Sequence, residues 1–213
     1  MSLRQNIARL LAISCLAFLV NSNIGIQPAS AAFQSTGLIA NWLGSSLSGS
    51  PTTWVDSVNS NSLALTSTTY NSSNGGYLSF NGTSSYAYKS TTLTSFTAST
   101  VSMFFWINVP DLSATRVIQQ TARTSTNTAN EEQFLINATT GTLNYWDYDG
   151  ASMGFSGNST GAITANKWNY VGFVKKPTGV GNNSTLTFYI NGQAAGTITV
   201  SYTHLTLPTN REV

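Results

Sequence analysis

Hydrophobic and polar residues alternate along several short segments of the chain, which predicts β-strands with one buried face. The clearest case is residues 99–109, "STVSMFFWINV". Its apolar face is expected to consist of Val101, Met103, Phe105, Ile107 and Val109. The opposite face would then carry Ser102, Phe104, Trp106 and Asn108. This strand is therefore predicted to bury one aliphatic face and to leave two aromatic rings on the other.

Two further segments alternate almost as clearly. In residues 183–192, the apolar face consists of Leu186, Phe188 and Ile190, and the segment ends in Asn191-Gly192, a strong hairpin signal. In residues 167–176, Val171 and Phe173 lie opposite Trp168, Tyr170 and Val174. Both segments are predicted to be strands.

Weaker strands are predicted elsewhere, and turn pairs such as Gly75-Gly76, Thr140-Gly141 and Asp149-Gly150 fall between them. The weaker strands are residues 37–43, 62–66, 76–80, 86–89, 116–120, 132–137, 142–148 and 195–199. Helical spacing is almost absent. About eleven short strands in one domain indicate an all-β fold, either an antiparallel two-sheet sandwich or a closed barrel.

Residues 75–89, "GGYLSFNGTSSYAYK", combine a short apolar run with a turn and two tyrosines. Leu78 and Phe80 are expected to enter the core, and the Asn-Gly pair that follows them to open a turn. Tyr86 and Tyr88 would share one face of the next strand. They could pack structurally or form a platform for a ligand, and we prefer structural packing.

Residues 1–31 have the pattern of a secretory signal peptide. A basic start is followed by the apolar run Leu10–Val20 and by the small-residue cleavage pattern Ala29-Ser30-Ala31. The run is too short for a membrane-spanning helix, so we predict a secreted mature chain without a membrane span. An uncleaved membrane anchor is the alternative. Cys15, the only cysteine, lies within this segment, which leaves the mature chain without a disulfide or thiolate metal site.

Residues 200–213, "VSYTHLTLPTNREV", resemble the translation of a sequencing-library adapter. We therefore predict that this tail is foreign, that the natural chain is truncated after about Thr199, and that one domain occupies residues 32–199. The alternative is a natural edge strand followed by a tail. A foreign tail would also remove any functional meaning from His204, the only histidine.

The charges exclude a polyanionic partner. The whole chain has nine Lys and Arg residues against seven Asp and Glu residues, and the two ends account for the excess. Residues 32–199 then carry equal numbers of cationic and anionic side chains. Without a basic face, neither nucleic acid nor an anionic lipid surface is expected to bind.

Several segments in sequence order resemble laminin G-like domains of the concanavalin A-like lectin/glucanase superfamily. They are "GLIANW", "TTWVDSVNSNSLALT", "GGYLSFNGTSSYAYK", "FTASTVSMFFWINVPDLS", "NKWNYVGFVKK" and "LTFYINGQAAGT". The resemblance spans about residues 37 to 196 and implies an antiparallel two-sheet jelly-roll sandwich. Family members usually continue beyond the last hairpin into further strands. Their absence here predicts an unpaired sheet edge.

Glycoside hydrolysis is the enzyme activity of this superfamily, and it needs two carboxylates that flank the scissile bond. The Glu-x-Asp-x-x-Glu pattern of the glucanase branch is absent from this sequence. Glu131 and Glu132 are adjacent and would point to opposite faces of a strand, one of them into a loop cap or solvent. We therefore predict that the protein is not an enzyme, with a degenerate glycosidase as the alternative.

Two acidic pairs could hold Ca²⁺, the one cofactor that the sequence suggests. Asp147 and Asp149 lie two residues apart beside a predicted turn, and Asp56 lies close to Asn59. The resemblance also implies a calcium site, because laminin G-like domains often bind calcium at a sheet rim. Asx-turns at strand ends are the alternative for both pairs, and we prefer that interpretation.

The aromatic residues on outward faces are the strongest ligand candidates, namely Phe104, Trp106, Trp146, Tyr148 and Tyr189. Aromatic rings stack on the CH face of a pyranose while amide and carboxylate groups bond its hydroxyls. The sequence thus predicts a secreted, non-catalytic module that binds a polysaccharide or a glycosylated surface. Two alternatives stay open: a loop that covers the rings as a small second core, or a structural or adhesive domain with a protein partner.

Overall fold

The computed structural model describes residues 37–90, 100–120, 131–148, 153–178 and 184–200. Contacts divide the chain into two compact units, which are described separately below. The first comprises Met1–Ser79 and Tyr86–Tyr88, and the second Phe80–Ser85 and Lys89–Val213. The boundaries predicted from the sequence, a single domain over 32–199 flanked by a leader and a foreign tail, stay a prediction.

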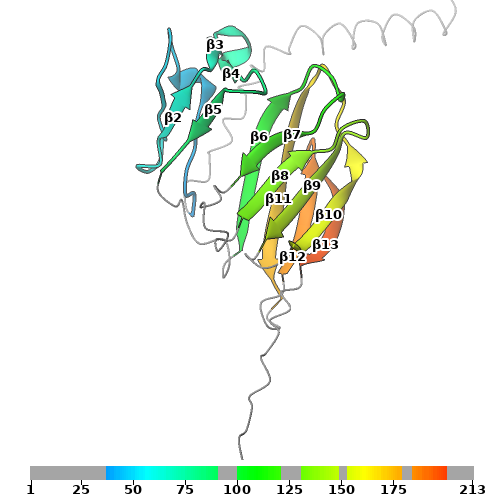
Figure 1. The fold of residues 1–213 in the computed structure, drawn as a ribbon. Coiled ribbons are helices and arrows are strands. Elements are labelled where there is room, and N and C mark those ends of the chain that lie inside the picture. Colours follow the sequence, from blue (N-terminus) through cyan, green and yellow to red (C-terminus); the bar gives the residue numbers. More distant parts are fainter. Residues whose placement is uncertain (1–36, 91–99, 121–130, 149–152, 179–183, 201–213) are drawn as a thin grey trace, which may run out of the picture. The chain divides into compact units, whose positions relative to one another are not determined.

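The second unit contains two four-stranded antiparallel sheets (Figure 1). The first sheet has the order β13-β12-β11-β6. Its strands are β6 (Val101–Asn108), β11 (Trp168–Pro177), β12 (Ser184–Ile190) and β13 (Gln193–Val200). The other sheet has the order β10-β9-β8-β7. Its strands are β7 (Arg116–Gln120), β8 (Glu131–Ile136), β9 (Thr142–Tyr148) and β10 (Met153–Ala162).

The inner faces of these two sheets form one hydrophobic core. Its buried members are Val101, Val109, Phe134, Ile136, Leu143, Tyr145, Ile163, Val171, Phe173, Leu186, Phe188, Ile190 and Ala195. Burying each large apolar side chain contributes about 1.5–3 kcal/mol, so this core stabilises the sandwich. The predicted all-β, antiparallel two-sheet architecture is confirmed, as are the buried faces predicted for β6, β11 and β12.

Residues with positive φ form the predicted hairpin turns. Asn191 and Gly192 have φ of 51° and 81°, as a type I′ turn between β12 and β13 requires. The β8–β9 turn uses Thr139 at φ 66° and Gly141 at φ 68°. Asn191 also fixes the turn from its side chain, because its Oδ1 accepts the Tyr170 N–H at 2.9 Å.

The first unit consists of short strands and has little core. The strands β1 (Thr53–Trp54), β2 (Leu63–Thr66) and β5 (Tyr86–Tyr88) form one antiparallel sheet, while β3 (Thr69–Asn71) pairs with β4 (Tyr77–Ser79). Short 3-10 helices occupy η1 (Gly44–Ser46) and η2 (Ser73–Gly75). Among the described residues of this unit, only Leu47 and Asp56 are buried.

The strand predicted over residues 37–43 is wrong, since this segment contributes only an isolated bridge between Trp42 and Asp56. Side chains rather than a neighbouring strand satisfy its backbone. Asp56 Oδ1 accepts the Asn41 N–H at 2.8 Å, and the Asn59 and Asn61 amides donate to the Ile39 carbonyl at 2.7 and 2.9 Å.

Phe80 does not enter the core, because β4 ends at Ser79 and the alternation that predicted its burial stops there. Its side chain is 48% exposed. Tyr86 and Tyr88 share one face of β5 as predicted. Both are nevertheless about half exposed, with ring centroids 5.6 Å apart, which contradicts the structural packing that we preferred.

Strand β10 was missed because its sequence, "MGFSGNSTGA", has almost no apolar alternation. It pairs with β9, with register shifts between Met153 and Phe155 and between Asn158 and Ala162. On its other side it lies close to β13, where a Cβ at Gly196 would be 3.1 Å from Thr160 Cγ2. In the described part of the chain, β13 is the last strand of its sheet.

Candidate functional site

Strand β6 presents two aromatic rings on the outer face of its sheet. Its residues alternate between the core and solvent, because successive side chains of a strand point to opposite faces. Phe104 is 36% exposed and Trp106 is 65% exposed. The outward direction predicted for both rings is therefore what the structure shows.

The neighbouring strands bring two tyrosines beside these rings. On β11, Tyr170 lies directly opposite Trp106, and Gly172 lies opposite Phe104. On β12, Tyr189 lies on the other side of Gly172. Tyr170 was placed on the outer face from the sequence but was not proposed as a ligand residue. Pairing of β11 with β6 is the signal that would have identified it.

Together, these four side chains form a continuous aromatic row, in the order Tyr189, Phe104, Tyr170 and Trp106. The Tyr189 and Phe104 centroids are 5.9 Å apart, with 55° between the ring planes. Phe104 and Tyr170 are stacked at 5.3 Å and 16°. Tyr170 and Trp106 follow at 5.2 Å and 39°. Each contact lies in the range in which aromatic pairs attract one another.

Gly172 makes this row possible because the Phe104 ring occupies the space above it. A Cβ at Gly172 would overlap the Phe104 ring and the Met103 carbonyl oxygen. Glycine in the interior of a strand often marks such a close approach. The row therefore depends on the absence of a side chain at this one position of β11.

Uncharged polar residues flank the row on the same face. Ser102 precedes Phe104 by two residues on β6, and Asn108 follows Trp106 by two. Thr187 precedes Tyr189 by two on β12, and its hydroxyl bonds the Thr197 hydroxyl at 2.9 Å. The face thus combines rings with hydroxyl and amide groups that can both donate and accept hydrogen bonds.

Trp146 does not join this row, because it lies on β9 in the other sheet. It stands between Gln133 and Ser156 in the register, on the face opposite the buried Tyr145. Trp146 is half-buried, and beside it Asn144 is buried, with its amide donating to Asn158 Oδ1 at 2.7 Å. The structure therefore separates the predicted ligand residues onto two outer faces. The Tyr148 side chain lies outside the described residues.

Of the two predicted calcium pairs, Asp56 with Asn59 is the one that lies within the described residues. The Asp147 side chain and all of Asp149 lie outside the described residues, so that pair stays a prediction. In the register of β8 and β9, Asp147 is opposite Glu132. Among the described residues, no group of three or more His, Cys, Asp or Glu side chains could hold a metal ion.

Asp56 acts instead as the centre of a loop. Its Oδ1 accepts the N–H groups of Asn41 and Val58 at 2.8 and 3.0 Å, and its Oδ2 accepts those of Asn59 and Asn61, both at 3.1 Å. Burial raises the pKa of Asp56, but these four N–H groups outweigh it, so the pKa lies below its ordinary value. This geometry favours the Asx-turn interpretation over a metal site with Asn59.

Glu132 is turned inward and ion-paired, so it is not presented to a groove. The Lys175 ammonium donates to its Oε1 at 3.0 Å and to the Tyr145 hydroxyl at 3.2 Å. Lys175 also lies 5.5 Å from the centre of the Tyr145 ring. This cluster was not predicted from the sequence, although Lys175 follows Val171 and Phe173 on the inward side of β11.

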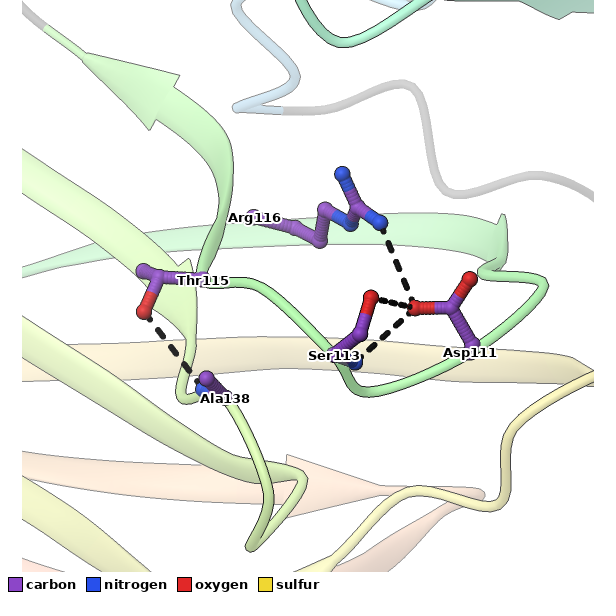
Figure 2. Close-up of polar contacts among 5 residues, drawn as sticks. All are labelled: Asp111, Ser113, Thr115, Arg116 and Ala138. Carbon is purple, nitrogen blue, oxygen red and sulfur yellow. Dashed lines mark hydrogen bonds and ion pairs between the residues drawn. The ribbon is translucent and has the colours of Figure 1, made fainter.

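A second polar cluster lies in the loop between β6 and β7, shown in Figure 2. Asp111 Oδ1 accepts the Ser113 hydroxyl, the Ser113 N–H at 2.8 Å and Arg116 Nη2 at 3.4 Å. The Ser113 hydroxyl and N–H, followed by the Arg116 guanidinium, lower the pKa of Asp111. Thr115 accepts the Ala138 N–H at 3.4 Å. These bonds shape the loop, and an exposed ion pair of this kind adds little stability.

Comparison with known proteins gives a family but no individual relative. Neither the curated proteins nor the solved structures contain a match to this chain. A laminin G-like family profile, described as the concanavalin A-like lectin/glucanases superfamily, matches residues 80–212. The match includes most of the tail for which we predict a foreign origin, of which Val200 alone is described as part of β13.

Domains of this type are typically extracellular and usually non-catalytic, although the superfamily includes glycosidases. None of the helices in the described ranges is long and apolar enough to span a membrane. The profile covers more than half of the 213 residues. On this match and its antiparallel β-sandwich, the chain belongs to the concanavalin A-like lectin/glucanases superfamily, as a laminin G-like domain.

Proposed function

We propose that this protein is a secreted, non-catalytic carbohydrate-binding or cell-surface adhesion module. It binds a polysaccharide or a glycosylated surface through the aromatic row. One observation carries the proposal: four aromatic rings line the outer face of a sheet, and the Trp106 side chain at the end of the row is 65% exposed.

Exposed rings at this position indicate a binding site, because the outer face of a two-sheet sandwich is normally polar. Leaving a large apolar surface in water is unfavourable, and contact with a partner removes that cost. A pyranose offers both an apolar CH face for an indole and hydroxyl groups for neighbouring amides. Asn108 lies two residues from Trp106 on the same face and is exposed.

The non-catalytic assignment is supported by what the described carboxylates do. Hydrolysis of a glycosidic bond requires two carboxyl groups that flank the substrate. Glu132 is buried against Lys175, and Asp56 accepts four backbone N–H groups. Asp111 is engaged with Ser113 and Arg116 in an exposed loop.

A protein partner is the second candidate, and the position of the row favours it. The row lies on the face of a sheet, and exposed Trp and Tyr side chains are frequent anchors of protein interfaces. Under this alternative, the same row would bind an apolar patch of another surface protein, and no glycan would compete.

A glycan array probed with the full chain tests the proposal. The array is run with Ca²⁺ and with a chelator, because this also tests a calcium site at Asp147 and Asp149, the alternative to the Asx-turn that we prefer there. We expect glycan binding that is lost in Trp106→Ala. The matched control, Val117→Ala, changes another exposed apolar residue, on β7 of the other sheet, and should bind like wild type.

The alternative outcomes are distinct. Absence of glycan binding under both conditions would contradict the proposal and leave the protein partner as the leading candidate. Binding that survives Trp106→Ala but is lost in Trp146→Ala would move the site to the outer face of β9. Binding that requires Ca²⁺ would support a calcium site.

A further inference from the structure

We infer that the aromatic row offers a single stacking position, on Trp106. The ligand is then one pyranose unit of a soluble or flexible glycan, rather than the flat surface of a crystalline polysaccharide. This inference rests on the proposed function and specifies its substrate class.

The two interior rings of the row, Phe104 and Tyr170, stack on each other. Phe104 and Tyr170 are nearly parallel, with 16° between their planes and centroids 5.3 Å apart, so they form an offset stack in which each ring covers part of the other's face. A flat binding platform needs the opposite arrangement, with rings side by side in one plane and their faces open. The other two contacts, at 55° and 39°, also turn the rings away from a common plane.

The four rings of the row differ in how many other rings they contact. Phe104 contacts both Tyr189 and Tyr170, and Tyr170 contacts both Phe104 and Trp106. The two terminal rings have one neighbour each within the row. Tyr189 is half-buried, whereas Trp106 is 65% exposed, nearly twice the 36% of Phe104. Trp106 is therefore the ring that retains enough open surface to stack on a sugar.

The surroundings of Trp106 also suit one sugar unit. Asn108, on the same face, supplies one amide with two donor hydrogens and an acceptor oxygen. Directly across from Asn108 is Trp168, which is half-buried. Tyr170 closes the side toward the rest of the row. A second sugar along the row would meet ring edges instead of a ring face.

Affinity as a function of chain length tests this inference. The full chain is titrated with soluble oligosaccharides of one to six units of glucose, N-acetylglucosamine, mannose and galactose. Crystalline cellulose and chitin serve as flat insoluble probes. One stacking position predicts that the affinity for a recognised sugar rises by less than about threefold from two to six units, and that neither crystalline probe retains the protein.

The results that overturn the inference differ from those that overturn the function. Retention on crystalline cellulose or chitin, or a rise of more than about tenfold with chain length, would refute the single position while leaving carbohydrate binding intact. No binding to any soluble or crystalline probe would refute both.

Variants along the row give a second readout. Trp106→Ala should weaken binding by about tenfold or more, which equals about 1.4 kcal/mol, while Trp106→Phe should retain part of the affinity because it keeps a ring face. Tyr189→Ala at the other end should stay within about twofold of wild type. Thermal melts confirm that each variant is folded. An equal loss in Tyr189→Ala and Trp106→Ala would contradict the inference.

Discussion

At the residue scale, the buried ion pair between Lys175 and Glu132 is the clearest case of a side chain that needs its partner. Their side chains are 1% and 10% exposed, and their charged atoms are 3.0 Å apart. Removing two charges from water costs free energy that only close pairing and further hydrogen bonds offset. The Tyr145 hydroxyl supplies one of these bonds. Since Lys175 belongs to β11 and Glu132 to β8, the pair also connects the two sheets.

Replacing Lys175 with Met is expected to lower the free energy of unfolding by about 3 kcal/mol or more, because the buried Glu132 carboxylate loses its compensating charge. Urea denaturation followed by circular dichroism measures the change. In the matched double variant, Glu132→Leu with Lys175→Met, both charges are replaced by apolar groups, and most of the stability should return. A double variant no more stable than Lys175→Met would contradict this account.

Asp56 gives a prediction for pH at the same scale. Its pKa is lower in the folded chain than in the unfolded chain, so the carboxylate stabilises the loop above pH about 4 and loses this effect as the pH falls through the folded pKa. Asp56→Asn should remove about 1–3 kcal/mol at neutral pH and abolish this acid dependence.

Hydrogen exchange of the backbone N–H groups of Asn59 and Asn61, measured at pH 7 and below pH 4, reports directly on their hydrogen bonds to Asp56. In wild type, protection should fall as the pH is lowered. The control is Asp111→Asn, which changes a loop carboxylate of the second unit and should leave these two amides unaffected. Equal protection in wild type and Asp56→Asn would show that the carboxylate does not hold this loop.

Strands with clear alternation could be predicted from the sequence, and those without it could not. In β6 and β12, the residues expected to face the core are buried or packed against the core cluster. Strand β10 has no such signal, because its pairing with β9 comes from backbone bonds and most of its residues are glycine or small polar residues. The strand predicted over residues 37–43 was wrong for the opposite reason. This segment has an apolar pattern, but its backbone bonds to side chains instead of to a neighbouring strand.

The candidate site could be predicted only in part for a related reason. Alternation alone places Phe104, Trp106 and Tyr189 on outer faces. Their assembly with Tyr170 depends on the register of β6, β11 and β12, which joins residues far apart in the sequence. The same non-local pairing explains why Trp146, which is half-buried, lies on the face of the other sheet.

Gly172 provides the prediction at the element scale. Gly172→Ala should destabilise the protein by about 1–3 kcal/mol, because the new methyl group overlaps backbone as well as the Phe104 ring. It should also weaken glycan binding by displacing the row. Thermal unfolding and the glycan titration measure the two effects.

The control for this substitution is Gly161→Ala on β10. A Cβ there would meet Ala195 Cβ at 3.4 Å and Ile190 Cδ1 at 3.7 Å, which are ordinary contacts. Its stability should equal or slightly exceed that of wild type. A Gly172→Ala variant as stable as Gly161→Ala would contradict the close approach of β6 to β11 at Gly172.

At the scale of the whole molecule, stability is concentrated in the second unit. That unit holds the entire cluster of buried core residues, whereas the first unit buries only Leu47 and Asp56 among its described residues. Regions with few buried apolar contacts open at lower free energy than core strands.

Native-state hydrogen exchange should therefore separate the two units. We expect the amides of β8, β9, β11 and β12 to exchange at least about tenfold more slowly than those of β1, β2 and β5. Strands are compared with strands, so backbone bonding is matched and core burial is the variable. Equal protection in the two units would contradict the assignment of the core to the second.

The central claim is that the aromatic row contacts a carbohydrate, and the indole N–H signals of the five tryptophans test it most directly. The ¹⁵N-labelled full chain is mixed with soluble oligosaccharides of glucose, N-acetylglucosamine, mannose and galactose, and the Trp106 signal is assigned from its loss in Trp106→Phe. We predict that the Trp106 signal shifts most on addition of the recognised sugar. A Trp106 signal that stays in place under every addition would contradict the claim.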